Sequence, residues 1–235
     1  MDILNFTPKK IGLSNNQLKI IAMISMLIDH IGHTLFPNVI ILRILGRIAF
    51  PIFAYMIAEG CLHTKNRLKY LLHLLILGLG CQIVYFIAMG SLYQGILLTF
   101  SLSIILIYTL DYFIKKKNVL SFIIAILTTL LIITISGVLP YFFKKSGFEF
   151  DYGLIGVFAP VLIYYAKHKL FKLIAVTICI VLLAIQYNSI EIYSLIALLF
   201  LVLYNNKRGK YNLKYMFYIF YPLHLVVVYL LSLMF

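Results

Sequence analysis

Nine long apolar runs, separated by short polar stretches, follow one another along the 235 residues of the chain. A helix needs about 20 mostly apolar residues to cross a bilayer. The strands of a membrane β-barrel would alternate apolar and polar residues, and these runs do not. The pattern therefore predicts an all-α, polytopic membrane protein of about nine transmembrane helices, at residues 18–36, 39–62, 69–89, 94–114, 119–139, 153–166, 171–187, 190–206 and 214–235.

The predicted domain organisation is simple. Residues 1–17 form a polar lead-in, in which Ser14 and Gln17 have the spacing of a capping box that starts a helix. Residues 18–235 contain no soluble stretch and no repeat. We expect them to form a single transmembrane helical domain.

Composition excludes the soluble classes. Hydrophobic residues make up 63% of the chain and charged residues 11%, against about 45–50% and about 25% in soluble domains. The three cysteines, Cys61, Cys81 and Cys179, are widely separated. Their spacing predicts neither a disulfide framework nor a metal site.

The net charge of +13 is distributed unevenly. Sixteen basic residues lie before the first run or close to the loops after the second, fourth, sixth and eighth runs, whereas the other loops hold only Lys144 and Lys145. Basic loops stay in the cytoplasm, so we expect a multi-pass protein of the bacterial inner or plasma membrane with its N-terminus inside. Short clusters between apolar runs orient a membrane protein and do not indicate a nucleic-acid partner.

Apart from Lys19 and Glu59, which lie toward the inner surface, five ionisable residues lie within the first two runs: Asp29, His30 and His33, then Arg43 and Arg47. Such groups are costly at membrane depth and usually have a function. On a helix Asp29 and His33 lie about 40° apart, and the two arginines share a face. Because only a short turn separates the two runs, we expect all five in one layer near the middle of the bilayer. An ion-pair cluster that merely joins two helices is the structural alternative, but five ionisable groups are an expensive way to do so.

The last run carries His224 at a depth that places it in the same layer, and Pro222 is expected to kink this helix so that Tyr221 and His224 point inward. Glu59 is expected near the inner surface, paired with Lys65 or Arg67.

Three further polar residues are expected to have only local roles. His73 and Glu191 lie near the ends of their runs, where side chains extend to water. Asp111 lies near a triple lysine and is expected to form a surface ion pair.

Several segments resemble the TraX family of membrane acetyltransferases over nearly the full length. They are residues 19–32, 43–54, Glu59-Gly60, 64–67, Asp151-Tyr152-Gly153 and 221–225. The family is named for acetylating the N-terminus of conjugative pilin, and it is similar to transmembrane acyltransferases that use cytosolic acyl-CoA. The resemblance places Asp29-His30 on the family's Asp-His pair, and Arg47 on the arginine of its Gly-Arg-x-Ala-Phe-Pro segment.

These residue types are the ones that acyl transfer requires. A histidine takes the acceptor's proton, a carboxylate orients it, and buried arginines stabilise the oxyanion or bind the acceptor. We expect acetyl-CoA as donor substrate, no permanently bound cofactor, and an acceptor that is a protein N-terminus or an envelope glycan or lipid. The expected catalytic residues are Asp29, His30 and Arg47. Expected substrate-binding residues are Arg43, His33, Glu59, Asn66, Arg67, Tyr221 and His224, with Asn66 and Arg67 on the CoA phosphates; His33 also stays open as the base.

A proton-coupled transporter or flippase is the alternative. Buried Asp, His and Arg side chains would then form a proton relay and a substrate site. The lack of a visible inverted repeat weakens this interpretation.

Overall fold

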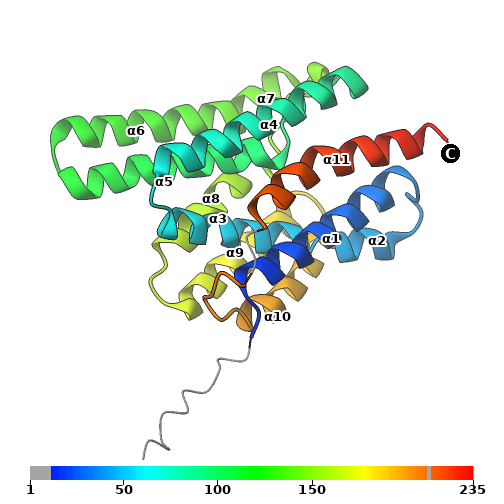
Figure 1. Ribbon diagram of the computed structural model, residues 1–235. Coiled ribbons are helices and arrows are strands. Elements are labelled where there is room, and N and C mark those ends of the chain that lie inside the picture. The colour runs from blue at the N-terminus through cyan, green and yellow to red at the C-terminus, as the bar shows by residue number, and fades with distance from the viewer. Residues whose placement is uncertain (1–11, 211–212, 235) are drawn as a thin grey trace, which may run out of the picture.

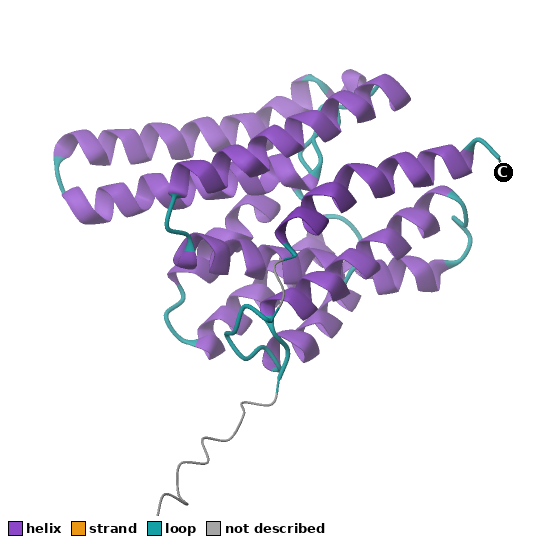
Figure 2. Cartoon of the chain, viewed as in Figure 1, coloured by secondary structure: helices purple, strands orange, loops and turns teal. Residues whose placement is uncertain are grey.

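The computed structural model describes residues 12–210 and 213–234, and within them the chain is helical and has no strand (Figures 1 and 2). Two isolated parallel bridges join Leu13 to Tyr204 and Gln94 to Phe150. The all-α prediction is confirmed. The elements are α1 (Asn15–Thr34), α2 (Ile40–Gly46), α3 (Ala49–His63), α4 (Arg67–Met89), α5 (Ile96–Lys116), α6 (Val119–Ile133), the π-helix η1 (Thr134–Val138), α7 (Leu139–Phe142), the 3₁₀ turn η2 (Lys144–Ser146), α8 (Gly153–Tyr165), α9 (Lys169–Gln186), the 3₁₀-helix η3 (Ser189–Ile196), α10 (Ala197–Val202) and α11 (Lys214–Ser232).

Each predicted run overlaps helical structure, although the run 119–139 ends in the π-helix η1, the run 190–206 is a 3₁₀-helix followed by α10, and two further runs differ as follows. Helix α1 begins at Asn15, because the predicted capping box forms: the Ser14 amide donates to Gln17 Oε1 at 2.8 Å, and the Gln17 amide donates to Ser14 Oγ at 3.4 Å. The run 39–62 is not one helix, because it is interrupted at Arg47 and Ile48, between α2 and α3. This break places Arg47 at the junction of two helices.

Five helical segments of the described chain are long and apolar enough to cross a bilayer: Ile40–His63, Arg67–Met89, Ile96–Lys116, Val119–Phe142 and Lys169–Gln186. Gly153–Tyr165, Ser189–Val202 and Met216–Ser232 are apolar but shorter. A membrane protein is therefore supported, while the number of nine spans stays a prediction.

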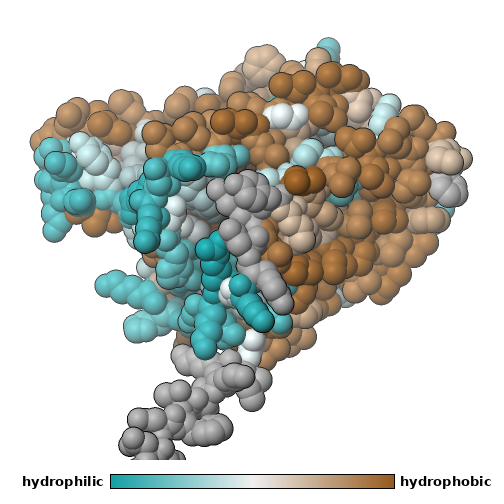
Figure 3. Space-filling view, viewed as in Figure 1, coloured by the Kyte–Doolittle hydropathy of each residue, from teal (hydrophilic) through white to brown (hydrophobic). Residues whose placement is uncertain are grey.

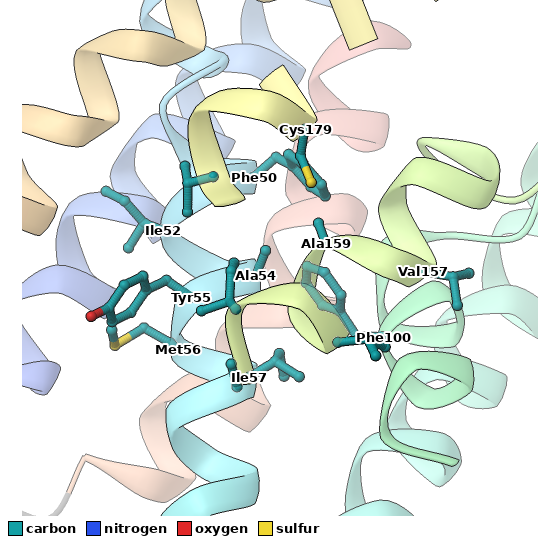
Figure 4. Packing of buried hydrophobic residues seen from close by; sticks show 14 of the residues in the cluster. Phe50, Ile52, Ala54, Tyr55, Met56, Ile57, Phe100, Val157, Ala159 and Cys179 are labelled. Atoms are coloured by element: carbon teal, nitrogen blue, oxygen red, sulfur yellow. The ribbon is translucent and has the colours of Figure 1, made fainter. Parts of the chain in front are cut away.

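Helix α3 lies at the centre of the packing (Figure 4). Phe50, Ile52, Ala54, Tyr55 and Met56 are almost completely buried against α1, α5, α8 and α9. Helices α4 and α6, in contrast, expose most of their apolar side chains, as helices facing lipid do. The core therefore positions the first three helices firmly, and α4 and α6 form the periphery.

The polar ends of the helices gather on one side. The start of α1, the turns after α3, α5 and α8, and the segment between α10 and α11 all lie at one end of the molecule in Figure 1. Hydrophilic residues concentrate over this end in Figure 3, and the rest of the visible face is mainly apolar. These are the loops that carry the basic residues, so this end is the one predicted to face the cytoplasm, and we call it the basic end.

Candidate functional site

Asp29 pairs with both arginines of the following run. Arg43 Nη1 donates to Asp29 Oδ2 at 2.8 Å, and Arg47 Nη2 donates to the two carboxylate oxygens at 2.7 and 2.8 Å. The side chains of Asp29 and Arg47 are only 18% and 9% exposed. Charge-assisted hydrogen bonds of this length compensate the cost of burying the charges. The structure thus brings Asp29, Arg43 and Arg47 together.

Gly46 makes this approach possible. A Cβ atom at Gly46 would lie 2.3 Å from both the Cβ and Oδ1 of Asp29, a distance that real Cβ atoms do not show. The last residue of α2 therefore has to be glycine for the carboxylate to enter the space between α1 and α2. A glycine between two arginines four residues apart is a signal that sequence reasoning did not use.

Arg47 also binds a second carboxylate. Its Nη1 donates to Glu191 Oε1 at 2.6 Å, and the hydroxyl of Tyr152 lies 3.5 Å from the same nitrogen. The expectation that Glu191 extends to water is wrong, because Glu191 is 6% exposed. Helix η3 packs against α2 and carries Glu191 to the buried guanidinium, whose charge compensates the carboxylate's lost hydration.

The loop before α8 borders the same cluster. The hydroxyl of Tyr93 donates to Asp151 Oδ1 at 2.7 Å, and the ring of Tyr152 stacks on Phe50 with centroids 4.0 Å apart. Burial raises the pKa of the Asp151 carboxyl to about 6, although the hydrogen bond from Tyr93 and the charge of Arg47 oppose this shift. Tyr93 and Asp151 thus extend the polar network beyond Arg47.

His30 faces His224. Their ring centroids lie 5.0 Å apart in an edge-to-face arrangement, and the ring of Phe220 stacks on His224 at 4.9 Å. Nδ1 of His30 lies 2.8 Å from the carbonyl oxygen of Met26, and Nδ1 of His224 lies 2.9 Å from that of Phe220. A carbonyl oxygen only accepts, so we assign the hydrogen to each Nδ1 and an unprotonated Nε2 to each neutral ring.

The Nε2 atom of His224 is fully buried and has no hydrogen-bond partner among the described residues, and the same holds for the hydroxyl of Tyr221. Buried polar groups are nearly always paired, so each exception calls for an explanation. The unpaired Nε2 belongs to the ring that contacts His30 and is available to a small polar group of a ligand.

His33 is placed differently from its neighbours. It lies one turn beyond Asp29 on α1 and is exposed, and no ion pair joins it to Asp29 within the described chain. Asp29 directs its carboxylate to the arginines instead, so the structure does not bring these two residues of the predicted layer into contact.

A cavity of about 620 Å³ extends inward from the basic end, and neither His30 nor His224 is among the residues that line it. Lys19, Lys69 and Arg208 line it together with Asn66, while Phe53, Phe100 and Tyr221 form its apolar part. The ring of Tyr221 lies 5.8 Å from the ring of His224. The cavity therefore leads from cationic side chains to Tyr221, whose ring contacts that of His224.

Glu59 lines the cavity but does not pair with Lys65 or Arg67, as the sequence led us to expect. Lys172 of α9 donates to it at 2.5 Å, and His63 Nε2 lies 3.4 Å away. Arg67 pairs with Asp111 at 2.6 Å and stacks on Tyr108, and it is not among the residues that line the cavity. Its ion pair directs the guanidinium of Arg67 to Asp111 on α5.

In the part of the chain that the structure describes, no group of three His, Cys, Asp or Glu side chains is arranged to hold a metal ion.

Comparisons with known proteins agree on a family. The family model described as "TraX protein" matches residues 14–232. The chain is similar to the probable fimbrial assembly protein FimC, serogroup H1, of Dichelobacter nodosus, with 26% identity over 94% of this chain and 96% of that protein. It is also similar to the uncharacterized protein RP591 of Rickettsia prowazekii, with 55% identity over 38 residues, which are 16% of this chain and 15% of that protein. No solved structure matches the chain.

Proposed function

The chain belongs to the TraX family, and from this premise we propose that it is a membrane-embedded acyltransferase. It moves an acetyl group from cytosolic acetyl-CoA to an amine or hydroxyl acceptor at or across the membrane. The observation that carries the proposal is the His30–His224 pair, whose neighbour Tyr221 lines a cavity that extends to the basic end. The alternative of a proton-coupled transporter has no comparable observation in its favour.

The cavity suits a donor with anionic phosphates and a long, thin arm. Lys19 and Arg208 offer positive charge for the phosphates of CoA, and Asn66 offers an amide. The less polar lining by Phe53 and Phe100 suits the arm that carries the thioester. Arg67, bound to Asp111, has no part in this proposal.

His30 and His224 supply the base. The Nε2 of one neutral ring takes the proton of the acceptor as its nitrogen or oxygen attacks the thioester carbonyl. The tetrahedral intermediate then expels the CoA thiolate. The imidazolium donates its proton to this sulfur, and the histidine returns to its neutral form. The carbonyl oxygens of Met26 and Phe220 orient the two rings, a task that a carboxylate has in serine proteases.

The arginine cluster supplies the electrostatics. Asp29 directly precedes His30, so the guanidinium groups bound to Asp29 lie beside the same turn of α1, although the two side chains point about 100° apart. The Nε–H of Arg47 is buried and has no partner among the described residues, which leaves one donor for the oxyanion or for the acceptor. Asp29 therefore acts as a positioning residue for Arg43 and Arg47, and does not orient the base.

The similarity to a fimbrial assembly protein favours one acceptor over the others. We take the acceptor to be the amino terminus of a membrane-associated protein subunit.

A single assay tests the proposal. Purified protein in lipid vesicles is incubated with acetyl-CoA labelled on the acetyl group and a short peptide with a free N-terminus, and the N-acetylated peptide serves as control. We expect release of CoA and labelling of the free peptide only, and loss of both in His30→Ala but not in His33→Ala. Absence of acetyl-CoA binding and of CoA release would overturn the proposal, and proton-dependent uptake of a solute by the same vesicles would favour the transporter.

A further inference from the structure

A second cavity, of about 510 Å³, lies on the flank of the molecule between α4 and α11. Leu68, Leu72, Ile76 and Leu77 line it along one side of α4, and Tyr218 of α11 closes the other side. Leu68, Leu72 and Ile76 are 65%, 42% and 66% exposed on a helix that is long and apolar enough to cross a bilayer. The groove therefore faces lipid and is open to it.

One end of the groove is polar and cationic. Asn66 and Lys69 line this end, at the first turn of α4, and Lys65 precedes them in the turn after α3. Lys69 has no carboxylate partner within residues 12–210 and 213–234, and the first turn of α4 contains no acidic residue. Glu59 and Asp111, the acidic residues of the described basic end, are bound to Lys172 and Arg67. The cationic end is therefore complementary to an anion.

The length of the groove suits one leaflet of a bilayer. From Asn66 to Ile76 the helix rises about 15 Å, which is half of the hydrocarbon thickness of about 30 Å. The polar end lies at the basic end of the molecule, and the apolar end reaches toward the middle of the membrane. An amphiphile with an anionic head and an apolar chain matches both ends at once.

We propose that this groove binds one anionic glycerophospholipid of the inner leaflet. Its phosphate lies against Lys69, and one acyl chain follows Leu72 and Ile76. His73 stacks on Tyr218 with ring centroids 5.7 Å apart, and both residues also line the inner cavity. The bound lipid thus covers the outer side of the wall between α4 and α11 and separates the cavity from the bulk bilayer. This inference does not depend on acetyl transfer.

The absence of tryptophan from the sequence allows a direct test. Ile76→Trp places a single fluorophore in the groove, and Leu127→Trp places one on α6, where the side chain is 61% exposed and lies at a similar distance from its helix start. Each variant is reconstituted in phosphatidylcholine vesicles, and brominated phosphatidylglycerol or brominated phosphatidylcholine is added as quencher. We expect brominated phosphatidylglycerol to quench the tryptophan in the groove about fivefold more effectively than brominated phosphatidylcholine, as one lysine near an anionic lipid surface implies. The two lipids should quench the tryptophan on α6 equally.

Charge variants distinguish lipid binding in the groove from a general attraction of anionic lipid to the basic surface. In the Ile76→Trp background, Lys69→Gln is expected to abolish the preference, whereas Lys116→Gln, which removes an equally exposed charge from the end of α5, leaves it unchanged. Glycerol 3-phosphate should not relieve the quenching, because the head alone lacks the chain contact. Equal quenching by the two lipids in the groove, an equal loss of preference in both charge variants, or relief by glycerol 3-phosphate would each overturn the proposal.

Discussion

The ring of His30 meets the ring of His224 edge to face, with the centroids 5.0 Å apart, although the two residues lie on the first and the last long helix of the described chain. Each ring is held through Nδ1 by a carbonyl oxygen of its own helix. The two Nε2 atoms are thereby left for other partners, and the inner cavity ends at Tyr221, whose ring lies 5.8 Å from that of His224.

If this pair is the base, both histidines contribute to turnover. We expect His30→Ala and His224→Ala each to lower acetyl transfer by about 10²–10⁴-fold, the usual contribution of general-base catalysis. His33→Ala should retain most of the activity, because its side chain is exposed. Rates of CoA release under saturating acetyl-CoA distinguish the three variants. A His33→Ala variant that is inactive beside an active His30→Ala would move the base to His33.

Arg47 neutralises two buried carboxylates, so its removal should be costly. We expect Arg47→Ala to lower the free energy of unfolding by about 3–5 kcal/mol, because Asp29 and Glu191 are left without their shared partner. Unfolding by denaturant in detergent measures the change. Adding Glu191→Gln to Arg47→Ala should recover part of the loss, and a strictly additive double variant would contradict the coupling.

The planar fork of Arg47 matters beyond its charge. Lysine keeps the charge but cannot bind Asp29 and Glu191 through separate nitrogens. We expect Arg47→Lys to lower acetyl transfer at least tenfold, or about 1.4 kcal/mol of barrier, and Arg43→Lys to have a smaller effect, because Arg43 has only the one carboxylate partner among the described residues. Full activity in Arg47→Lys would show that charge alone counts.

Gly46 should tolerate no side chain. Gly46→Ala places a methyl group against the carboxylate of Asp29, and we expect a loss of about 1–3 kcal/mol, typical of overpacking, together with reduced acetyl transfer. Gly80→Ala is the matched control: a Cβ there meets nothing within 4 Å, and alanine is the better helix former by about 0.5–1 kcal/mol. Thermal unfolding of both variants checks the contrast, and equal stabilities would contradict it.

The predicted membrane orientation rests on the charge asymmetry, and labelling of single cysteines tests it. In a chain whose three cysteines are replaced by alanine, Ser189→Cys and Lys145→Cys should react with an impermeant thiol reagent in intact cells. Lys116→Cys should react only after the membrane is permeabilised. All three positions are exposed in the structure, so access to the reagent depends on the side of the membrane. The reverse pattern would invert the predicted topology.

The sequence by itself determined the helical class, the place of each helix and the pairing of Asp29 with the arginines. These properties are local: apolar run length sets the helix, and a short turn makes Asp29, Arg43 and Arg47 neighbours on adjacent helices. The capping box at Ser14 is equally local, and its two halves are three residues apart.

Tertiary structure alone decided which distant groups complete the cluster. Helical periodicity gives the direction of a side chain relative to its own helix, but not the helix that it will meet. From the sequence, Glu191 is predicted to be the polar end of a run. In the structure, η3 packs against α2 and places the Glu191 carboxylate 2.6 Å from Arg47. His30 and Asp29 have different partners for the same reason. Consecutive residues on a helix point about 100° apart. The carboxylate therefore contacts the arginines that follow α1, and the imidazole contacts His224 of α11.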